Sequence, residues 1–285
     1  MTLTATGKTS VSGSAACSKP ALALNSAEDR LQIVLGHMSH AGPDAVPVLL
    51  QSRELTVPGR AMQHLAPALH EMFTTSGFGP ADLGKIACVR GPGGFTGLRL
   101  SLATALGLAK SSNIPMAGID YFPLLASGPA DLLNQGSLWV CTYARRNQVF
   151  LQGFSLTSDS LPPPPLTEVL VLDLQQTAQA IVAGPGPAHV LGSGLRRNLD
   201  TLPELLNPAQ DDPERPGPLL LPPAWDHPSP AHLLAQALPL EATHEPIVPL
   251  YLRPSDAEQN IEAIAAKRGV SPDHAKAMLS QPGHK

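Results

Sequence analysis

Charged and aromatic residues are both scarce in this chain. Of its 285 residues, 15% are Asp, Glu, Lys or Arg, and 4% are Phe, Trp or Tyr. A sizeable core is still possible because 43% of the residues are hydrophobic, and Ala, Leu and Val must build most of it. The formal net charge is −4, with short basic pairs such as Arg145–Arg146 and Arg196–Arg197. A protein that grips nucleic acid by itself normally carries a strong basic patch, so the composition argues against that class.

Cysteine is nearly absent as well, and long apolar runs are missing. The three cysteines, Cys17, Cys88 and Cys141, are widely spaced and odd in number, which argues against a disulfide framework and fits a reducing compartment. The first 20 residues lack the apolar stretch of a signal peptide, and no segment approaches the roughly 20 apolar residues of a membrane span. We therefore expect a cytoplasmic protein that does not enter a membrane.

Proline, by contrast, is abundant. The chain has 31 prolines, about twice the usual share of roughly 5%. They cluster, most densely in the stretch 203–230, and therefore indicate loops rather than a fibrous protein. Residues 1–20 are rich in Ser, Thr, Ala and Gly, which predicts a disordered extension. A tail over 255–285 contains two helix candidates, at 255–268 and 272–279.

Apolar periodicity predicts the first part of the chain as a meander followed by a helix. Short apolar runs predict three strands, at 21–26, 31–36 and 47–55. Apolar spacings near three and four predict a helix over 60–76, which contains Pro67 and ends at Gly77.

A strand, a glycine loop, a helix and a second strand follow in the stretch 85–120. The loop GPGGFTG begins at Gly91, and Thr96 is the expected N-cap of the helix, which runs to residue 112. A crossover of this kind predicts a parallel strand pair and an α/β fold.

A second set of elements is predicted after residue 120. We expect strands at 138–144 and 147–154 joined by a turn at Arg145–Arg146. The remaining expectations are a strand-to-helix stretch at 166–182, an apolar run ending in a glycine turn at 188–195, a helix at 230–240 and an extended segment at 247–254.

The segment 86–126 carries the most specific motif of the chain. Its sequence GPGGFTGLR, followed by an alanine-rich helix, resembles the hallmark G-P-G-S-F-T-G-[LV]-R of the TsaB (YeaZ) family, which belongs to the Gcp-like (peptidase M22) superfamily. Gly94 stands where that family usually has serine. Weaker likeness extends over residues 21–255, for example at PLYLR (249–253), which resembles the closing P-x-Y-L-R of the family.

This resemblance implies a fold and a domain organisation. The implied fold is α/β, a two-lobed actin-like ATPase fold of the acetate/sugar kinase–actin type, in which each lobe is a mixed sheet flanked by helices. The first lobe is expected at 21–120 and a second, smaller lobe at 121–254. The extension 1–20 and the tail 255–285 lie outside the resemblance.

The resemblance also implies a function. It predicts a non-catalytic subunit of the tRNA threonylcarbamoyladenosine synthase complex, working with a TsaD-type catalytic homologue and a TsaE-type ATPase. The complex uses ATP and threonylcarbamoyl-adenylate and modifies the adenosine next to the anticodon in tRNAs that read codons beginning with A. This chain is expected to bind no cofactor tightly, to reach tRNA through the complex and to form homodimers when alone.

Members of the family pair through the helices of the first lobe. The residues expected at that interface are Leu65, Leu69, Met72, Leu102 and Ala105. The alternative is that these apolar side chains form the core of the chain itself.

Two interpretations of the glycine loops remain open from the sequence. The glycines can allow a strand and a helix to pack closely, or the loop amides can hold an anion at the helix N-terminus. The loop is not a Walker A motif, because it lacks the Gly-Lys-Ser/Thr ending. The candidate residues for contact with an anion, tRNA or nucleotide are Gly91, Gly93, Gly94, Thr96, Arg99, Arg145, Arg146, Gly192 and Gly194.

Two positions depart from the pattern that nucleotide-binding relatives show. Asn25 matches the position of an Asp that places metal and water in the actin-like superfamily, and a neutral amide is a poorer metal ligand. Tyr143 stands where the TsaB (YeaZ) family usually has Asp. Asn25 and the lack of a phosphate-binding lysine argue against an independent actin-like ATPase or kinase, which stays open as an alternative together with a self-associating scaffold. Tyr143 argues against an anionic role of the second lobe.

No residue pattern supports metal binding or peptidase chemistry. His64 and His70 are six residues apart on one expected helix, so they lie on different faces, unlike an i, i+4 ligand pair. His37 and His40 lie in an expected loop without cysteine or carboxylate partners. We therefore expect no metal site and no catalytic residue, and the peptidase label of the superfamily finds no support in this chain.

Overall fold

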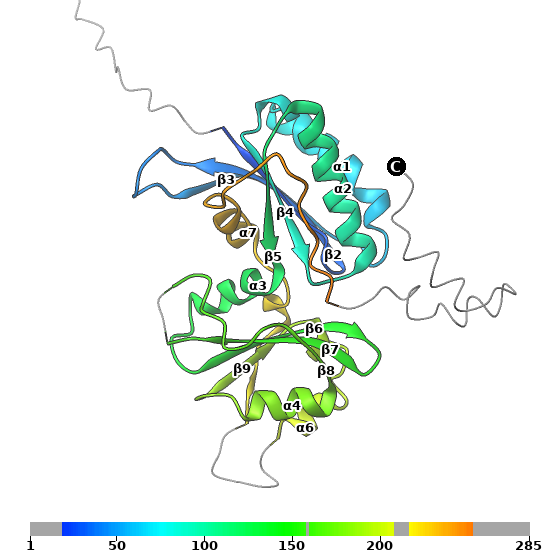
Figure 1. Cartoon of the computed structure of the whole chain (residues 1–285), viewed down its shortest axis with the longest axis vertical. Coiled ribbons are helices and arrows are strands. Elements are labelled where there is room, and N and C mark those ends of the chain that lie inside the picture. Colours follow the sequence, from blue (N-terminus) through cyan, green and yellow to red (C-terminus); the bar gives the residue numbers. More distant parts are fainter. Residues whose placement is uncertain (1–18, 158–159, 208–216, 253–285) are drawn as a thin grey trace, which may run out of the picture.

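The computed structural model describes residues 19–157, 160–207 and 217–252 (Figure 1). The expected tail helices lie outside the described residues, as does nearly all of the expected N-terminal extension. The described chain builds two lobes, each a five-stranded mixed sheet flanked by helices. This arrangement confirms the expected α/β class with two mixed sheets.

The first sheet begins with the expected meander. Its strands, in the order β3-β2-β1-β4-β5, are β1 (Ala21–Asn25), β2 (Arg30–Met38), β3 (Pro47–Thr56), β4 (Lys85–Gly91) and β5 (Met116–Asp120). β1, β2 and β3 are antiparallel neighbours, whereas β4 runs parallel to both β1 and β5. The parallel pairs require crossovers, which helices provide.

Two long helices cover one face of this sheet, α1 (Ala61–Ser76) and α2 (Phe95–Ser112) (Figure 1). Gly77 ends α1 with a left-handed backbone, at φ 75°, as expected. The N-cap of α2 is Gly94 and not Thr96, because the chain leaves its extended conformation at Gly94, two residues earlier than expected. Thr96 therefore lies within the first turn of the helix.

The second sheet has the strand order β10-β9-β6-β7-β8. Its strands are β6 (Ser137–Arg145), β7 (Gln148–Ser155), β8 (Leu170–Asp173), β9 (Ala188–Leu191) and β10 (Leu219–Leu220). Its helices are α4 (Leu174–Val182), α5 (Ser193–Arg196) and α6 (Leu202–Leu205). The turn between β6 and β7 lies at Arg146–Asn147, one residue later than expected, where Asn147 adopts a positive φ of 60°.

The two lobes share one topology. In each, three antiparallel strands are followed by a helix, a strand parallel to the first strand, a second helical segment and an edge strand. The sequence contains no recognisable repeat, so only the backbone arrangement shows this duplication. It makes the glycine loop after β4 the topological counterpart of the glycine turn after β9.

The expected second lobe ends too late in the chain. Helix α7 (Pro230–Ala237) packs on β1, β2 and β3 of the first sheet, on the face opposite α1 and α2 (Figure 1). Thr243 then bridges to Met116 beside β5. The chain returns to the first lobe because the first sheet needs apolar residues packed against both of its faces. Leu233 and Leu234 of α7, both fully buried, cover the second face.

A lysine ties this returning helix to the sheet. Lys85, at the start of β4, places its Nζ 3.3, 2.5 and 2.8 Å from the carbonyl oxygens of Ala237, Leu238 and Leu240. These carbonyls lie at and just beyond the C-terminus of α7, where a cation is favourable.

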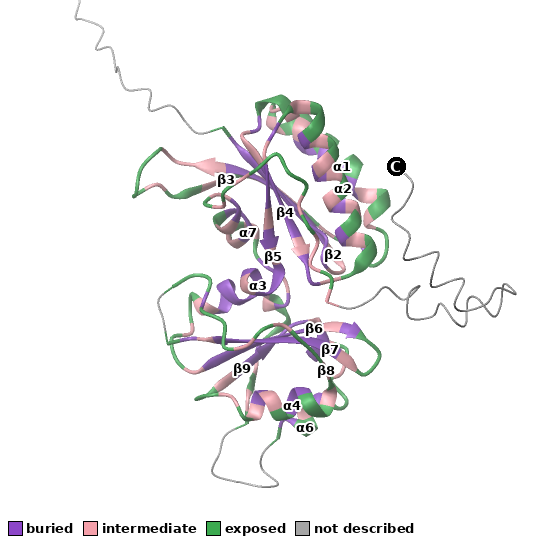
Figure 2. Cartoon of the chain, viewed as in Figure 1, coloured by how far each residue is buried: buried purple, intermediate pink, exposed green. Residues whose placement is uncertain are grey.

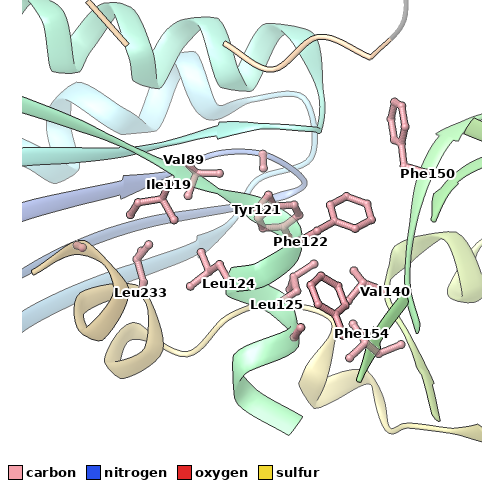
Figure 3. Packing of buried hydrophobic residues seen from close by; sticks show 14 of the residues in the cluster. Val89, Ile119, Tyr121, Phe122, Leu124, Leu125, Val140, Phe150, Phe154 and Leu233 are labelled. Atoms are coloured by element: carbon pink, nitrogen blue, oxygen red, sulfur yellow. The ribbon is translucent and has the colours of Figure 1, made fainter. Parts of the chain in front are cut away.

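Buried apolar residues form three clusters, and one of them joins the lobes. Figure 2 shows that the buried residues concentrate in the strands of both sheets. The joining cluster, here called the central core, includes Val89 from the first sheet, Tyr121 and Phe122 from α3 (Tyr121–Ala130), and Val140 and Phe154 from the second sheet (Figure 3). The helices of the described residues include none that is long and apolar enough to cross a bilayer.

Candidate functional site at the junction of the lobes

The glycine loop packs directly on the turn between β1 and β2. A Cβ atom at Gly93 would overlap the carbonyl oxygen of Ala27, and one at Gly97 would overlap the carbonyl oxygen of Ser26. The amide of Gly94 donates a hydrogen bond of 2.6 Å to the Ala27 carbonyl. Close packing therefore accounts for Gly93 and Gly97, and one amide of the loop is already used within the chain.

Asn25 shapes the same turn. Its side chain is buried, its Oδ1 accepts the amide of Ala27 at 3.0 Å, and its Nδ2 donates to Oε1 of Gln32 at 2.7 Å. A side chain that bonds the backbone two residues ahead stabilises a turn without metal. Asn25 thus has a structural role in this turn.

The glycine turn of the second lobe is built in the same way. Gly192 has a positive φ of 113°, and a Cβ atom there would overlap the carbonyl oxygen of Cys141. Gly194 is close to the Cys141 side chain, since a Cβ atom there would lie 2.8 Å from its Sγ. The amide of Gly192 donates to Oδ1 of Asp226 at 2.8 Å. Both residues are therefore required by the fold of the second lobe.

Glu28, from the β1–β2 turn, bridges the two lobes. The hydroxyl of Ser193, in the second lobe, donates a hydrogen bond to Oε1 of Glu28. The hydroxyl of Tyr121 donates to Oε2 at 2.9 Å. Ser193 in turn accepts the amide of Tyr143 at 3.0 Å. One carboxyl group therefore connects the first sheet, α3 and the glycine turn of the second lobe.

The surroundings of Glu28 favour its protonated form. The pKa of Glu28 is raised to about 7, chiefly because burial desolvates the carboxyl group and to a smaller extent because Asp29 and Asp226 are negatively charged. The hydrogen bonds from Ser193 and Tyr121 act in the opposite direction. Sequence reasoning missed Glu28, because nothing in its local sequence distinguishes it from an ordinary turn carboxylate.

A second bridge lies beside the first. Asp29 accepts a hydrogen bond from a guanidinium nitrogen of Arg197 at 2.9 Å, and this guanidinium lies 4.4 Å from the centroid of the Tyr143 ring. Arg196 pairs with Asp226 at 2.7 Å. The basic pair seen in the sequence therefore binds carboxylates of the chain itself.

These contacts make the junction a poor site for a polyphosphate. Arg197 and Arg196 pair with Asp29 and Asp226, and Glu28 accepts hydrogen bonds from Ser193 and Tyr121. The polar groups of the junction are therefore already occupied by contacts within the chain. The described residues contain no group of three or more His, Cys, Asp or Glu side chains that could hold a metal ion. The arrangement suits holding the lobes together better than nucleotide hydrolysis.

Comparison with known proteins finds sequence similarity over part of the chain. A sequence model described as TsaD, tRNA N6-adenosine threonylcarbamoyltransferase, matches residues 59–161. The tRNA threonylcarbamoyladenosine biosynthesis protein TsaB of Escherichia coli is 37% identical over 71 residues, covering 25% of this chain and 31% of the relative. TsaB of Bacillus subtilis is 33% identical over 84 residues, covering 30% and 36%. Over these aligned stretches the chain is similar to proteins of the TsaB (YeaZ) family.

A solved structure extends the likeness to the whole fold. YeaZ from Pseudomonas aeruginosa superposes with a TM-score of 0.59 at 19% identity, covering 82% of this chain and 100% of that one. At this identity the likeness concerns the fold. The aligned sequence spans about a third of the curated TsaB relatives, at 31% and 36% of their lengths.

The departure from the family motif at Gly94 is structurally mild. Gly94 has a φ of −63° and a ψ of 119°, which any residue adopts, and it is exposed. A Cβ atom there would meet the Ala27 carbonyl oxygen at 3.5 Å, an ordinary contact. Gly91 differs, since its φ of 118° is strained for other residues.

Four of the five expected interface residues are buried in the chain itself. Leu65, Leu69, Met72 and Ala105 lie between the helices and the first sheet, at 7% exposure or less, and only Leu102 is half-buried. These four residues therefore pack within the chain itself, and their contact with a partner stays a prediction. The strongest apolar stripe of an amphipathic helix faces its own sheet, so the periodicity that suggested an interface marks the core.

The candidate arginines occupy different parts of the molecule. Arg99 is exposed on the first turns of α2, near the exposed Thr96. Arg145 and Arg146 lie at the end of β6 in the second lobe, where Nε of Arg145 donates to Oε1 of Gln148 at 2.7 Å.

We predict that glycine substitutions in the loop will differ sharply in their effect. Gly93→Ala and Gly97→Ala introduce backbone overlap, so each is expected to lower the free energy of unfolding by roughly 1–3 kcal/mol or more. Gly94→Ser is expected to change it by less than about 1 kcal/mol, because its backbone is already compatible. Urea denaturation measures all three. Equal destabilisation by Gly94→Ser and Gly93→Ala would contradict the packing described here.

We predict that Glu28 makes folding stability depend on pH. Its folded-state pKa of about 7 lies above 4.5, the ordinary pKa of a glutamate side chain, so the folded state binds the extra proton between these values. This stabilisation is complete below the unfolded pKa and is lost as the pH rises through about 7.

The free energy of unfolding is therefore expected to fall from about pH 5 to about pH 8, and to fall less in Glu28→Gln. Glu204→Gln, which removes a carboxylate on α6, is the matched control and is expected to keep the original profile. Identical profiles for the Glu28→Gln variant and the unmodified chain would refute the assignment.

Proposed function

We propose that this chain acts in the biosynthesis of threonylcarbamoyladenosine in tRNA, as a non-catalytic partner of a TsaD-type transferase in the cytoplasm. The observation that carries the proposal is the likeness to proteins named tRNA threonylcarbamoyladenosine biosynthesis protein TsaB in Escherichia coli and Bacillus subtilis. The junction supports the non-catalytic part, because its glycines and carboxyl groups serve packing and lobe bridging.

In this proposal each of the three proteins has a separate role. The TsaD-type partner binds threonylcarbamoyl-adenylate and transfers its acyl group to the adenosine next to the anticodon, in tRNAs reading codons that begin with A. A TsaE-type ATPase uses ATP to support turnover. This chain contributes a rigid surface that holds the partner in its active form, and it binds none of these small molecules tightly itself.

The outer face of α1 and α2 is the surface we assign to the partner. On α2, Ala103 and Gly107 are exposed one turn apart, and a Cβ atom at Gly107 would meet nothing within 4 Å. The half-buried Leu102 and Leu106 flank them, and Met62 of α1 is 68% exposed. Small residues between larger apolar ones allow a partner helix to approach closely. A homodimer formed by the chain alone would use the same face.

A reconstitution assay tests the function. We expect modified adenosine to form when this chain, a TsaD-type protein, a TsaE-type ATPase, threonylcarbamoyl-adenylate and unmodified tRNA are combined, and not when this chain is omitted. The chain alone is expected to form no product. Equal product without the chain would refute the proposal, and mass spectrometry of the digested tRNA provides the measurement.

Two substitutions at one position test the partner surface. Gly107→Ala is expected to stabilise the isolated chain by roughly 0.5–1 kcal/mol, because alanine favours a helix and meets no neighbour. Gly107→Glu is expected to fold but to lose binding to the TsaD-type protein in size-exclusion chromatography and calorimetry. Undiminished binding of the Gly107→Glu variant would place the interface elsewhere.

A further inference from the structure

Phe95 and Arg99, in the first turns of α2, stack with Tyr251 near the end of the described chain. The guanidinium carbon of Arg99 lies 3.7 Å from the centroid of the Phe95 ring and 5.6 Å from that of Tyr251. The two ring centroids are 5.3 Å apart at an angle of 34°, and Nε of Arg99 donates to the Tyr251 hydroxyl at 3.0 Å. The stack is thus a defined arrangement of two aromatic planes and one cation.

The rings of Phe95 and Tyr251 are exposed, whereas the other aromatic residues of the chain are buried or half-buried. The chain contains six Phe, three Tyr and two Trp residues. Phe95, at 37%, and Tyr251, at 41%, are the exposed ones among them. Large apolar surfaces placed together in water commonly mark a contact surface.

The electrostatic surroundings of the stack favour an anion. Helix α2 begins at Phe95, has no acidic residue in its first turn and has no side-chain cap at its N-terminus. Its positive dipole end and Arg99 therefore act together. The two terminal amino groups of Arg99 have no hydrogen-bond partner in the part of the chain that the structure describes, whereas the nearby Arg90 is paired with Asp120.

Two exposed rings beside a cation whose terminal amino groups have no partner among the described residues match the chemistry of a nucleotide in single-stranded RNA. A base stacks on an aromatic ring whatever its sequence, while an arginine binds the adjoining phosphate. The chain has a net charge of −4 and no strong basic patch, so a contact of this kind would supplement the grip of a partner rather than replace it.

We propose that Phe95, Arg99 and Tyr251 form a stacking surface for an unpaired nucleotide of the tRNA held by the complex. The inference rests on the proposed function and specifies how this chain touches the RNA. Stacking supplies affinity without base specificity, so the surface orients the tRNA and leaves the choice of nucleotide to other parts of the complex.

Binding of unmodified tRNA to the assembled complex tests the stacking surface. Fluorescence anisotropy at one fixed salt concentration compares the unmodified chain with Phe95→Ala and Tyr251→Ala, each combined with the TsaD-type protein. We expect each substitution to raise the Kd for tRNA by about tenfold, the size of one lost stacking contact. Leu199→Ala, which removes an exposed apolar side chain of the second lobe, is the matched control and is expected to leave the Kd unchanged.

Conservative variants separate stacking from packing. Tyr251→Phe keeps the aromatic ring and is expected to bind tRNA with a Kd within about twofold of that of the unmodified chain. Tyr251→Leu and Phe95→Leu keep an apolar side chain but lose the aromatic face, so we expect them to bind tRNA about as weakly as the alanine variants. The leucine variants decide the question if an alanine variant melts at a lower temperature. Unchanged tRNA affinity in the leucine variants overturns the inference.

Assembly and activity measurements distinguish this inference from the proposed function. Loss of binding to the TsaD-type protein, with unchanged tRNA affinity for whatever complex still forms, would assign the stack to a protein contact and overturn the inference. If it holds, the variants raise the KM for tRNA while kcat stays near its original value. Product formation that is independent of this chain would instead defeat the proposed function, whatever the binding data show.

Discussion

The turn between β1 and β2 is the constraint on which the rest of the structure depends, since it contacts both lobes within five residues. The carbonyl oxygen of Ala27 receives an amide of the first glycine loop, while Glu28 and Asp29 reach Ser193 and Arg197 in the second lobe. A change in this turn would therefore alter the packing of α2 and the relative placement of the two sheets. The central core, which contains residues of both sheets, completes the connection.

The shared topology of the lobes explains why the β1–β2 turn contacts glycine turns from both lobes. Each lobe ends a strand in a glycine turn that leads into a helix. Both turns contact the β1–β2 turn, the first at the Ala27 carbonyl and the second through Ser193 at Glu28. In a nucleotide-binding protein such turns would leave room for phosphates. Here the carboxyl groups of Glu28, Asp29 and Asp226 come together at the junction, and hydrogen bonds from the chain itself satisfy them. The same geometry thus holds the two lobes together, which is compatible with the non-catalytic role proposed above.

Local patterns predicted most of the elements and few of the contacts. The meander, the crossover over 85–120, the left-handed cap at Gly77 and the strand-to-helix stretch over 166–182 follow from periodicity and turn residues. Errors arose where tertiary packing decides. The N-cap of α2 depends on where the glycine loop contacts the Ala27 carbonyl. The end of the second lobe depends on which sheet α7 packs against, and α7 packs against the first sheet. The expected interface residues were the buried stripe of each helix, because periodicity identifies the apolar face without telling what covers it.

The sequence by itself determined the fold class, the order of the main elements and, through the motif GPGGFTGLR, the resemblance to the TsaB (YeaZ) family. These properties depend on neighbouring residues, whose spacing records the helical or extended backbone directly. Only the tertiary structure decided what the glycines, Glu28 and the Phe95–Arg99–Tyr251 stack do. Glu28 and Ser193 are 165 residues apart, and Arg99 and Tyr251 are 152 apart. No local spacing encodes such pairs, because their approach results from the packing of whole lobes around a common core.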